Sequence, residues 1–351
     1  MAARLGDDRL EPLRADAKDE GGLTSMMSGW DVVINSTWYE LNLAVMGSAI
    51  RAGIHYLDLG GLYHMTLKQL ALDKKARDAG VTCVLGLGSS PGVTNLMAAL
   101  GARRLSRIDE VKIRVAGATL KPSSGFFNPP YSFRTILDEA CMPAVILREG
   151  KISEVPGLSV KEEFRLPDPV GSVEGYYTLH SELATLPTNL GKGVREMNFI
   201  VAFSSEFSRT LSVLVRLGLA SKDEVSLPGG RVVPYDLLTS LVDSLPKPDE
   251  QAVDVGVRRV EFFGEEDGAK AHLVYDCFSG PHLKWGIGGR PLGTGVPASL
   301  GAQWLGRGAV KEIGVLPPEL CIDPQPFLHE LSERGRGLVN TVDDGTERKQ
   351  L

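Results

Sequence analysis

The chain has 351 residues, a formal net charge of −6 at pH 7 and 43% hydrophobic residues. This length and composition are typical of about two globular domains and exclude a disordered protein. The acidic balance disfavours binding to nucleic acid or to an anionic membrane, and no apolar run approaches the ~20 residues of a membrane-spanning helix. The four cysteines are far apart, no histidine pair has zinc-site spacing, and the first residues lack the apolar core of a signal peptide. We therefore expect a cytoplasmic protein with reduced thiols and no metal.

The first hundred residues alternate between strand-like and helix-like patterns. Strands are expected at 31–35, 55–59 and 81–85, and helices at 38–52 and about 66–79. Gly53 and Gly80 follow the two helical segments and fit helix ends. Continuously apolar strands that alternate with helices predict βαβ units and a parallel sheet.

After about residue 105 the pattern changes to polar–apolar alternation, interrupted by loops rich in proline and glycine. Strands are expected at 110–115, 194–203, 258–264 and 272–276, and helices near 297–305 and 326–334. The acidic segment 265–268 predicts a hairpin turn, and Pro297 suits the first turn of a helix. These patterns predict a parallel α/β domain at 1–105, a mixed α+β domain at 106–290, and a C-terminal segment at 291–351 with a frayed tail.

Polar residues and glycines follow each of the first three expected strands. They are Asn35-Ser36-Thr37, then the segment from Asp58 to His64, then the segment from Gly86 to Asn95. The carboxyl ends of parallel strands meet at one edge of a sheet, where α/β proteins bind their ligands. The sequence therefore predicts a binding crevice at this edge.

The stretch LGLGSSPGVTN at residues 85–95 is similar to the dinucleotide-binding fingerprint G-x-G-x-x-G. Its sixth position is Pro91, however, and the third glycine, Gly92, comes one residue late. The fingerprint belongs to the first βα turn of a dinucleotide-binding fold, whereas this stretch is at least the third. We expect it to begin a helix with Ser89 or Ser90 as the cap, and the sequence contains no intact fingerprint.

Several long stretches resemble the saccharopine dehydrogenase-like family, and within it the lysine 6-dehydrogenase branch. They cover about residues 3–335 and include DVVINST, AGIHYLDLGGLYHMTLKQLALDKKARDAGVTCVLGLGSSPGVTN, YSFRTILDEACMPAVILREGK, LPDPVGSVEGYYTLHSELATLP, TGVPASLGAQWL and GVLPPELC. The resemblance implies a Rossmann-like, doubly wound NAD(P)-binding domain joined to an α+β domain for substrate binding and dimerisation. It further implies C-terminal helices that return to the first domain, and a homo-oligomer. The implied activity is NAD- or NADP-dependent oxidation at an amine-bearing carbon of a small substrate of the lysine or saccharopine class.

The chain departs from the family pattern at its beginning. Family members begin with a strand, the glycine fingerprint, a helix and a second strand, whereas Ala3–Asp16 here matches the region that leads into the third strand. We therefore expect an N-terminally truncated sheet in which residues 31–35 form an exposed apolar edge. Three interpretations remain open at this point: a truncated copy of an active enzyme, a cofactor-free homologue that binds or dimerises without catalysis, and an inactive fragment.

Cofactor contacts are expected by position from the first two strand ends. Asn35, Ser36 and Thr37 follow the first strand, and Gly60 and Gly61 allow a close approach of the backbone after the second. Asp16 either approaches the adenine side or is an ordinary turn residue.

Catalytic candidates are His64 and Tyr63 in the crevice, with Asp58 either orienting the base or capping a turn. His180 and Glu182 lie in a segment that resembles the family's substrate-facing element, although they also fit a solvated face. The substrate-binding candidates are Thr94, Asn95, Tyr131, Ser132 and Thr178. Arg134 or Arg165 could pair with a carboxylate, but most arginines here are expected to be surface charges.

Overall fold

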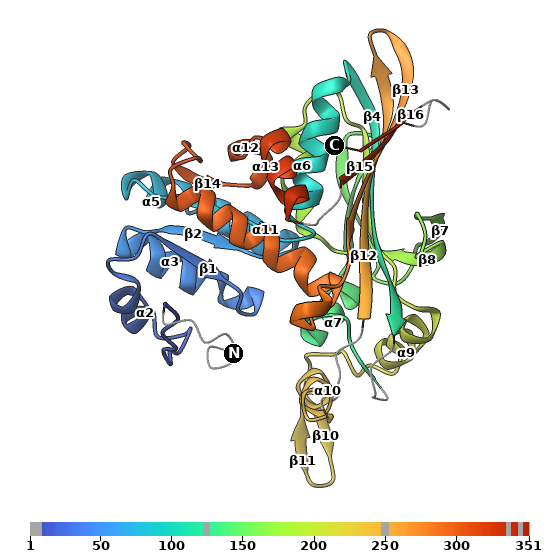
Figure 1. Ribbon diagram of the computed structural model, residues 1–351. Coiled ribbons are helices and arrows are strands. Elements are labelled where there is room, and N and C mark those ends of the chain that lie inside the picture. Colours follow the sequence, from blue (N-terminus) through green and yellow to red (C-terminus); the bar gives the residue numbers. More distant parts are fainter. Residues whose placement is uncertain (1–8, 122–126, 247–252, 335–337, 343–346, 351) are drawn as a thin grey trace.

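The computed structural model describes residues 9–121, 127–246, 253–334, 338–342 and 347–350. Two large β-sheets and one two-stranded sheet organise these residues, and Figure 1 shows the two large sheets side by side with the long helix α11 (Gly289–Gly306) crossing between them. Helix α11 packs on strands of both sheets. No helix in the described ranges is both long enough and apolar enough to cross a bilayer.

The first sheet is parallel and has the order β1-β2-β3-β14. Its strands are β1 (Val32–Asn35), β2 (His55–Asp58), β3 (Thr82–Val84) and β14 (Gly314–Leu316). Among the described residues β1 pairs only with β2, and Ile34 on it is 41% exposed. The expected parallel sheet is present, and within the described residues β1 lies at its edge with Ile34 exposed and Asn35 buried. The C-terminal segment adds the strand β14 to this sheet.

Helices connect and cover the strands of the first sheet. They are α2 (Glu20–Met27), the 3-10 turn η1 (Tyr39–Leu41), α3 (Asn42–Ala52), α4 (Leu62–Leu70), α5 (Asp73–Asp78) and α6 (Val93–Arg104). Helix α3 ends at Gly53, which has a φ of 72° as the predicted stop requires. The single helix predicted at 66–79 is instead two helices. The break places Asp73 where its carboxylate accepts a hydrogen bond from the backbone N of Val315 on β14 at 2.9 Å, a contact that local periodicity does not reveal.

The second sheet is mixed and has ten strands, with the main order β16-β15-β13-β12-β4-β9-β5-β6 and the β7–β8 pair joined to β9. The strands are β4 (Arg107–Lys121), β5 (Ala144–Arg148), β6 (Lys151–Val155), β7 (Lys161–Arg165), β8 (Ser172–Tyr177), β9 (Glu196–Val201), β12 (Val253–Glu266), β13 (Ala269–Ser279), β15 (Leu338–Val342) and β16 (Glu347–Gln350). The predicted hairpin is present, with its turn shortened to Asp267-Gly268. Both turn residues have positive φ, 51° and 83°, as a type I′ turn requires.

The remaining elements surround this sheet or project from it. They are α7 (Phe133–Cys141), η2 (Ser181–Ala184), α8 (Leu186–Asn189), α9 (Ser205–Arg216), β10 (Val225–Leu227), β11 (Gly230–Val232), α10 (Pro234–Asp243), η3 (Leu283–Trp285), α12 (Pro318–Cys321) and α13 (Pro324–Glu333). Figure 1 shows α10 and the β10–β11 hairpin as an arm that projects from the body. The prediction that a helix begins at Pro297 is wrong, because α11 already begins at Gly289 and contains Pro297 in its interior. Pro291 occupies the first turn instead, where a missing N–H leaves no helical bond unmade.

One hydrophobic core joins the two sheets. It includes Leu57 and Leu87 from the first sheet and its loops, Leu96 from α6, Phe199 from β9 and Trp304 from α11. A continuous core of this kind holds the edge of the parallel sheet against one face of the mixed sheet.

Candidate active site

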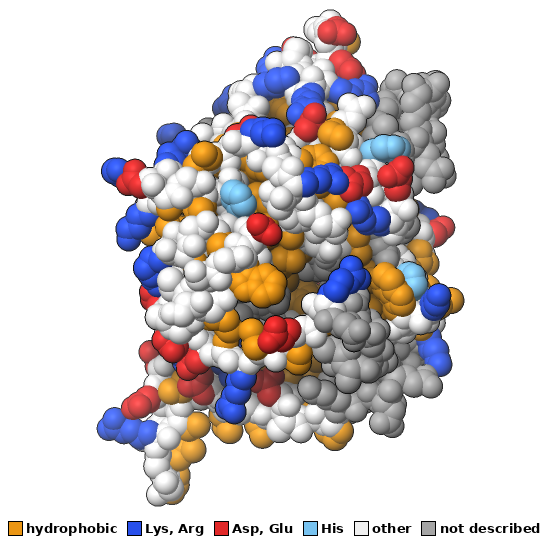
Figure 2. Space-filling model, turned by 60° about the vertical axis from the view of Figure 1, so that its left-hand side comes forward, with side chains coloured by type: hydrophobic (Ala, Val, Ile, Leu, Met, Phe, Trp, Pro, Cys, Tyr) orange, Lys and Arg blue, Asp and Glu red, His pale blue; other side chains and the backbone are white. Residues whose placement is uncertain are grey.

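A cavity of about 780 Å³ lies between the carboxyl edge of the parallel sheet and the face of the mixed sheet. Its walls are residues 36–39, 59–62 and 89–91 from the loops after β1, β2 and β3, residues 115–117 of β4, Phe199 and 201–203 at β9, 256–258 of β12, residues 130–132, Thr135 and Glu139 around α7, His180 and Ser181, and residues of α11 from Arg290 to Gly295. Figure 2 shows hydrophobic side chains around a hollow near the middle of one face of the molecule, with charges of both signs scattered around it. The crevice predicted from the three strand ends is therefore present, and the second sheet closes it.

The predicted site residues divide into those that border the cavity and those that do not. Those on its wall are Ser36, Thr37, Gly60, Gly61, Tyr131, Ser132 and His180. Those outside it are Asp16, Asn35, Asp58, Tyr63, His64, Thr94, Asn95, Thr178 and Glu182. Several of the second group hydrogen-bond to residues of the wall, and Glu182 contacts two of them, His180 and Ser90.

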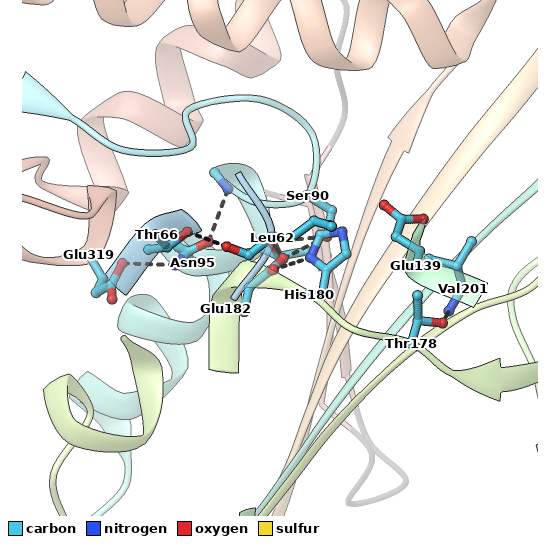
Figure 3. A network of polar contacts seen from close by, with 12 residues as sticks. Leu62, Thr66, Ser90, Asn95, Glu139, Thr178, His180, Glu182, Val201 and Glu319 are labelled. Carbon is cyan, nitrogen blue, oxygen red and sulfur yellow. Dashed lines mark hydrogen bonds and ion pairs between the residues drawn. The ribbon is translucent and has the colours of Figure 1, made fainter. Parts of the chain in front are cut away.

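His180 and Glu182 form a buried hydrogen-bonded pair, with Nδ1 of the imidazole against Oε2 of the carboxylate. The other carboxylate oxygen accepts hydrogen bonds from the hydroxyls of Ser90 and Thr94, both at 2.7 Å. The imidazole ring stacks on Phe199 with ring centroids 3.8 Å apart, and the described residues offer no hydrogen-bond partner to Nε2. Figure 3 shows His180 between Glu182 on one side and Glu139 on the other. This geometry fixes the ring of a residue that borders the cavity.

The pair is tuned toward its charged forms. Burial lowers the pKa of His180, but the carboxylates of Glu182 and Glu139 outweigh burial and hold this pKa above its ordinary value. Burial likewise acts to raise the pKa of Glu182, but His180 and the hydroxyls of Thr94 and Ser90 bring it below its ordinary value. An imidazole that is oriented and charged by a carboxylate can hold or release a proton at the cavity.

The stretch at residues 85–95 supports this pair. Its cap is Gly92, with a φ of 117°, and not Ser89 or Ser90 as expected, because Asn95 accepts a hydrogen bond from the Gly92 backbone N at 3.0 Å. A side chain at Gly92 would collide with the backbone of Gly88, 2.4 Å from its N atom. The two serines are thereby released from capping, and their hydroxyls instead contact Arg258 and Glu182. Asn95 turns away from the cavity and also donates to Glu319 at 2.8 Å.

Asp58 is a structural carboxylate. It is 1% exposed, and its oxygens accept hydrogen bonds from Gln69 at 2.6 Å, Tyr56 at 2.9 Å, and the backbone N atoms of Gly60 and Gly86 at 2.9 and 2.7 Å. Of the two roles expected for Asp58, the structure therefore shows the turn-capping one. It ties together the loops after β2 and β3, which form one wall of the cavity.

The other predicted residues outside the cavity make local contacts. Asn35 is buried and donates to Asn42 and Tyr56, while Thr178 bonds to Tyr176 and Val201 between neighbouring strands. Tyr63 and His64 lie on α4 and contact each other edge to face, with ring centroids 5.3 Å apart. These four residues do not reach the cavity through their side chains as the structure places them.

A second cavity of about 610 Å³ lies beside the first residues of the described chain. It is lined by Arg14, Ala15, Asp16, Ala17, Lys18 and Leu41. Asp16 also accepts a hydrogen bond from the Lys18 backbone N at 2.9 Å, so it is a turn residue that in addition borders a cavity.

Sequence reasoning missed Arg258, a cation on the main cavity wall. Its side chain is 3% exposed, donates to the hydroxyls of Ser89 and Ser279, and forms no ion pair with any carboxylate of the described residues. Burial lowers its pKa, as expected for a guanidinium removed from water. The available signal was the pair Arg258-Arg259 in a strand, because successive side chains of a strand point to opposite faces. Arg134 and Arg165, in contrast, pair with Asp243 and Asp168 away from the cavity.

Two glycines make room for the Arg258 guanidinium. A Cβ at Gly293 on α11 would lie 2.0 Å from Nη2 of Arg258, and one at Gly256 would lie 3.3 Å from the same atom. The backbones of α11 and β12 thus approach the guanidinium closely at these two glycines, because neither residue has a side chain. The guanidinium therefore occupies a compartment that side chains at these two positions would close.

Glu139 was also missed. It projects from α7 to the cavity wall and accepts a hydrogen bond from the hydroxyl of Tyr131. Burial raises its pKa to about 7, against the opposing effects of His180 and Tyr131. No group of three or more histidine, cysteine, aspartate or glutamate residues in the described ranges is arranged to hold a metal ion.

Comparison with known proteins identifies the family. Residues 1–84 match the saccharopine dehydrogenase NADP binding domain, and residues 88–336 match the saccharopine dehydrogenase C-terminal domain. Carboxyaminopropylagmatine dehydrogenase from Synechocystis is 28% identical over 95% of this chain and 86% of that protein. Carboxynorspermidine synthase from Vibrio cholerae is 26% identical over 94% of this chain and 82% of that protein.

Among solved structures, the apo saccharopine dehydrogenase (L-Glu forming) from Saccharomyces cerevisiae has the same fold. The TM-score is 0.73 at 16% sequence identity, and the match covers 100% of this chain and 91% of that chain. The α/β architecture with a parallel and a mixed sheet is therefore that of this enzyme class, and the chain is an oxidoreductase of the saccharopine dehydrogenase family that uses NAD(P).

Proposed function

We propose that this protein oxidises a carboxylate-bearing secondary amine at its C–N bond and forms the same bond in the reverse direction. One observation carries the proposal. Arg258, which is buried and has no ion-pair partner among the described residues, borders the same cavity as His180, whose ring is held by Glu182. Relatives named for carboxyaminopropylagmatine, carboxynorspermidine and saccharopine support the substrate class.

The residues beyond the strand ends fit the two halves of NAD(P). Leu59, Leu62 and Pro91 offer apolar surface for a nicotinamide ring. Ser181 borders the same space, and its buried hydroxyl lacks a hydrogen-bond partner among the described residues, so it is free to bond a carboxamide. The second cavity combines Arg14 and Lys18 with Asp16, a donor and acceptor set that suits a ribose and its phosphate. The bound cofactor supplies a hydride acceptor.

The chemistry assigns one proton to His180. Oxidation removes a hydride from the carbon next to nitrogen, for which a bound cofactor would be the acceptor, and a proton from the nitrogen, which leaves an imine. We assign this proton to Nε2 of His180, a residue that borders the cavity, while Glu182 holds the ring through Nδ1. Water then adds to the imine and releases a carbonyl compound and an amine, so the atoms and charges balance.

Arg258 positions the substrate for this step. Burial deprives the guanidinium of its hydrating water. A carboxylate that binds to the guanidinium compensates for this loss, so the site favours an anion. Because Arg258 is held by Ser89 in the loop that also supports Glu182 through Ser90, the carboxylate is placed at a defined position relative to His180. Such placement is a large part of enzymatic rate enhancement.

Two alternatives predict different outcomes. A lysine 6-dehydrogenase would use the same Arg258 for the lysine carboxylate but would act on a primary amine, as the sequence resemblance implied. A cofactor-free homologue would bind neither NAD nor NADP. The assembly into a homo-oligomer and the cytoplasmic location stay predictions.

The experiment is a substrate panel in the oxidative direction, with NAD⁺ and NADP⁺ tested separately. Carboxynorspermidine, carboxyaminopropylagmatine, saccharopine and L-lysine are compared by the absorbance of the reduced cofactor. We expect turnover of at least one secondary amine, with kcat/KM at least tenfold above that for lysine, a difference of about 1.4 kcal/mol in transition-state binding. Turnover of lysine alone would identify the primary-amine reaction. No reduction of either cofactor by any of the four compounds would contradict the proposal.

A further inference from the structure

Glu139 is a buried acid on the cavity wall that has no lysine or arginine partner among the described residues. Its side chain is 5% exposed, and among the described residues its hydrogen-bond partner is the neutral hydroxyl of Tyr131. No lysine or arginine of the described residues forms an ion pair with it. An ionised carboxylate in such a place is costly unless a positive charge joins it.

The charged groups that face Glu139 leave an excess of negative charge. Asp138 precedes it on α7, and Glu182 and His180 approach from the segment around η2. The imidazole is already paired with Glu182. Lys222 forms an ion pair with Asp138, with 3.2 Å between Nζ and Oδ1. One more positive charge near Glu139 would therefore balance the negative charge of these side chains.

Aromatic side chains border the same cavity as Glu139. Tyr131 and Phe203 both border the cavity, with ring centroids 6.1 Å apart, and Trp38 and Tyr39 border it from the loop after β1. Aromatic faces attract ammonium and guanidinium groups while offering apolar contact to a methylene chain. An alkyl chain that ends in a cation fits both properties of this wall.

We propose that Glu139, together with Tyr131 and Phe203 on the same cavity wall, binds a second positively charged nitrogen on the amine arm of the substrate. The bound group is an alkylammonium or guanidinium several methylenes from the reacting nitrogen. This subsite rests on the proposed function, because it accommodates the amine half of the secondary amine whose carboxylate end Arg258 binds. Glu139 is accordingly a specificity-determining residue that selects diamines over monoamines.

The titration of Glu139 is consistent with this role. Burial, together with Glu182 and Asp138, raises its pKa, while His180 and Tyr131 act in the opposite direction, and the balance is about 7. In the empty site the group can therefore be neutral near pH 7, which limits the cost of burying it. Arrival of a cation favours the carboxylate, so binding of a diamine releases a proton near neutral pH.

The test compares two amines of equal chain length and different charge. Binding of 1,3-diaminopropane and n-propylamine is measured by titration calorimetry in the presence of saturating NADPH. In the wild-type protein we expect the diamine to bind about tenfold more tightly, as for one desolvated charge contact. The substitution Glu139→Gln should bring the two affinities within about twofold, and Glu206→Gln, on the exposed side of α9, should leave the tenfold ratio unchanged.

Calorimetry in buffers of different ionisation enthalpy adds a readout that needs no variant. At pH 7 the wild-type protein should release more protons with 1,3-diaminopropane than with n-propylamine. Equal affinities of the two amines in the wild type, or an unchanged ratio in Glu139→Gln, would overturn the subsite. A Glu139→Gln protein that loses turnover of every substrate but keeps the diamine preference would also overturn it, and would assign Glu139 to proton transfer. Because binding is measured without turnover, failure of the proposed oxidation would not by itself alter these results.

Discussion

Arg258 donates a hydrogen bond from Nε to the hydroxyl of Ser89, although the two residues are 169 positions apart and come from β12 of the mixed sheet and from the loop after β3 of the parallel sheet. Ser90, the next residue, donates to Glu182, which in turn holds His180. One short loop after β3 therefore links the carboxylate-binding cation to the proton-transferring pair. Displacement of this loop should affect both together.

His180 should be the residue on which proton transfer depends. We expect His180→Asn to lower kcat by about 10²- to 10⁴-fold, the usual contribution of a general acid or base, while NADPH binding measured by fluorescence is retained. The matched control is His64→Asn, since His64 lies on α4 outside the cavity and should tolerate the change. A normal kcat in His180→Asn combined with a large loss in His64→Asn would reverse the assignment.

Glu182 should set the pH dependence of the reaction. Oxidation requires neutral His180, so its rate should rise with pH through the raised pKa of this residue, and the reductive direction should fall over the same range. Glu182→Gln removes the carboxylate that raises the pKa of His180. The rising limb of the oxidative kcat profile should therefore move to lower pH, and kcat on the plateau should fall because the ring loses its charged partner. An unmoved limb would show that another group titrates.

Gly293 should be required for the position of Arg258. A methyl group at this site would lie 2.0 Å from Nη2, so Gly293→Ala must displace the guanidinium. We expect KM for a carboxylated substrate to rise by about tenfold or more. Gly306→Ala, at the other end of the same helix and outside the cavity, meets only a methyl group of Val32 at 3.8 Å and should leave KM unchanged. Steady-state kinetics of the two variants separates the contact from a general effect on α11.

Asp58 should matter for stability and not directly for chemistry. Each group that surrounds its carboxylate is a donor, so Asp58→Asn places an amide N–H₂ against N–H and O–H groups. We expect the free energy of unfolding in urea to fall by about 3 kcal/mol. Asp16→Asn, at an exposed turn, should change it by less than about 0.5 kcal/mol. A similar loss in both variants would contradict the structural role of Asp58.

Much of the fold follows from local periodicity. The strands at β1, β2 and β3, the stop at Gly53 and the β12–β13 hairpin were all predictable, because each depends on neighbours in sequence. The division at 66–79 and the early start of α11 were not, since both depend on packing between distant segments. The domain limits at residues 105 and 290 stay predictions.

The candidate site was less accessible to sequence reasoning. The polar residues at the strand ends located the crevice, and the resemblance to the family pointed to His180 and Glu182. Position in the sequence alone favoured His64, which lies on α4 and does not border the cavity. Arg258 and Glu139 are ordinary charged residues in sequence. Only the tertiary structure shows that they are buried and without an ion-pair partner among the described residues.

The most direct measurement compares carboxynorspermidine with norspermidine, the same polyamine without the carboxylate, in the wild-type protein and in Arg258→Gln. In the wild type, kcat/KM should favour the carboxylated compound by about 100-fold or more, as expected for a desolvated guanidinium–carboxylate contact. Arg258→Lys keeps a charge without the guanidinium and should recover part of the preference, and NADPH binding with thermal melting checks that each variant is folded. In Arg258→Gln the preference should fall to within about tenfold, because the carboxylate loses its partner. A folded Arg258→Gln protein that retains the full 100-fold preference would contradict the assignment of Arg258, and with it the carboxylated secondary amine as substrate.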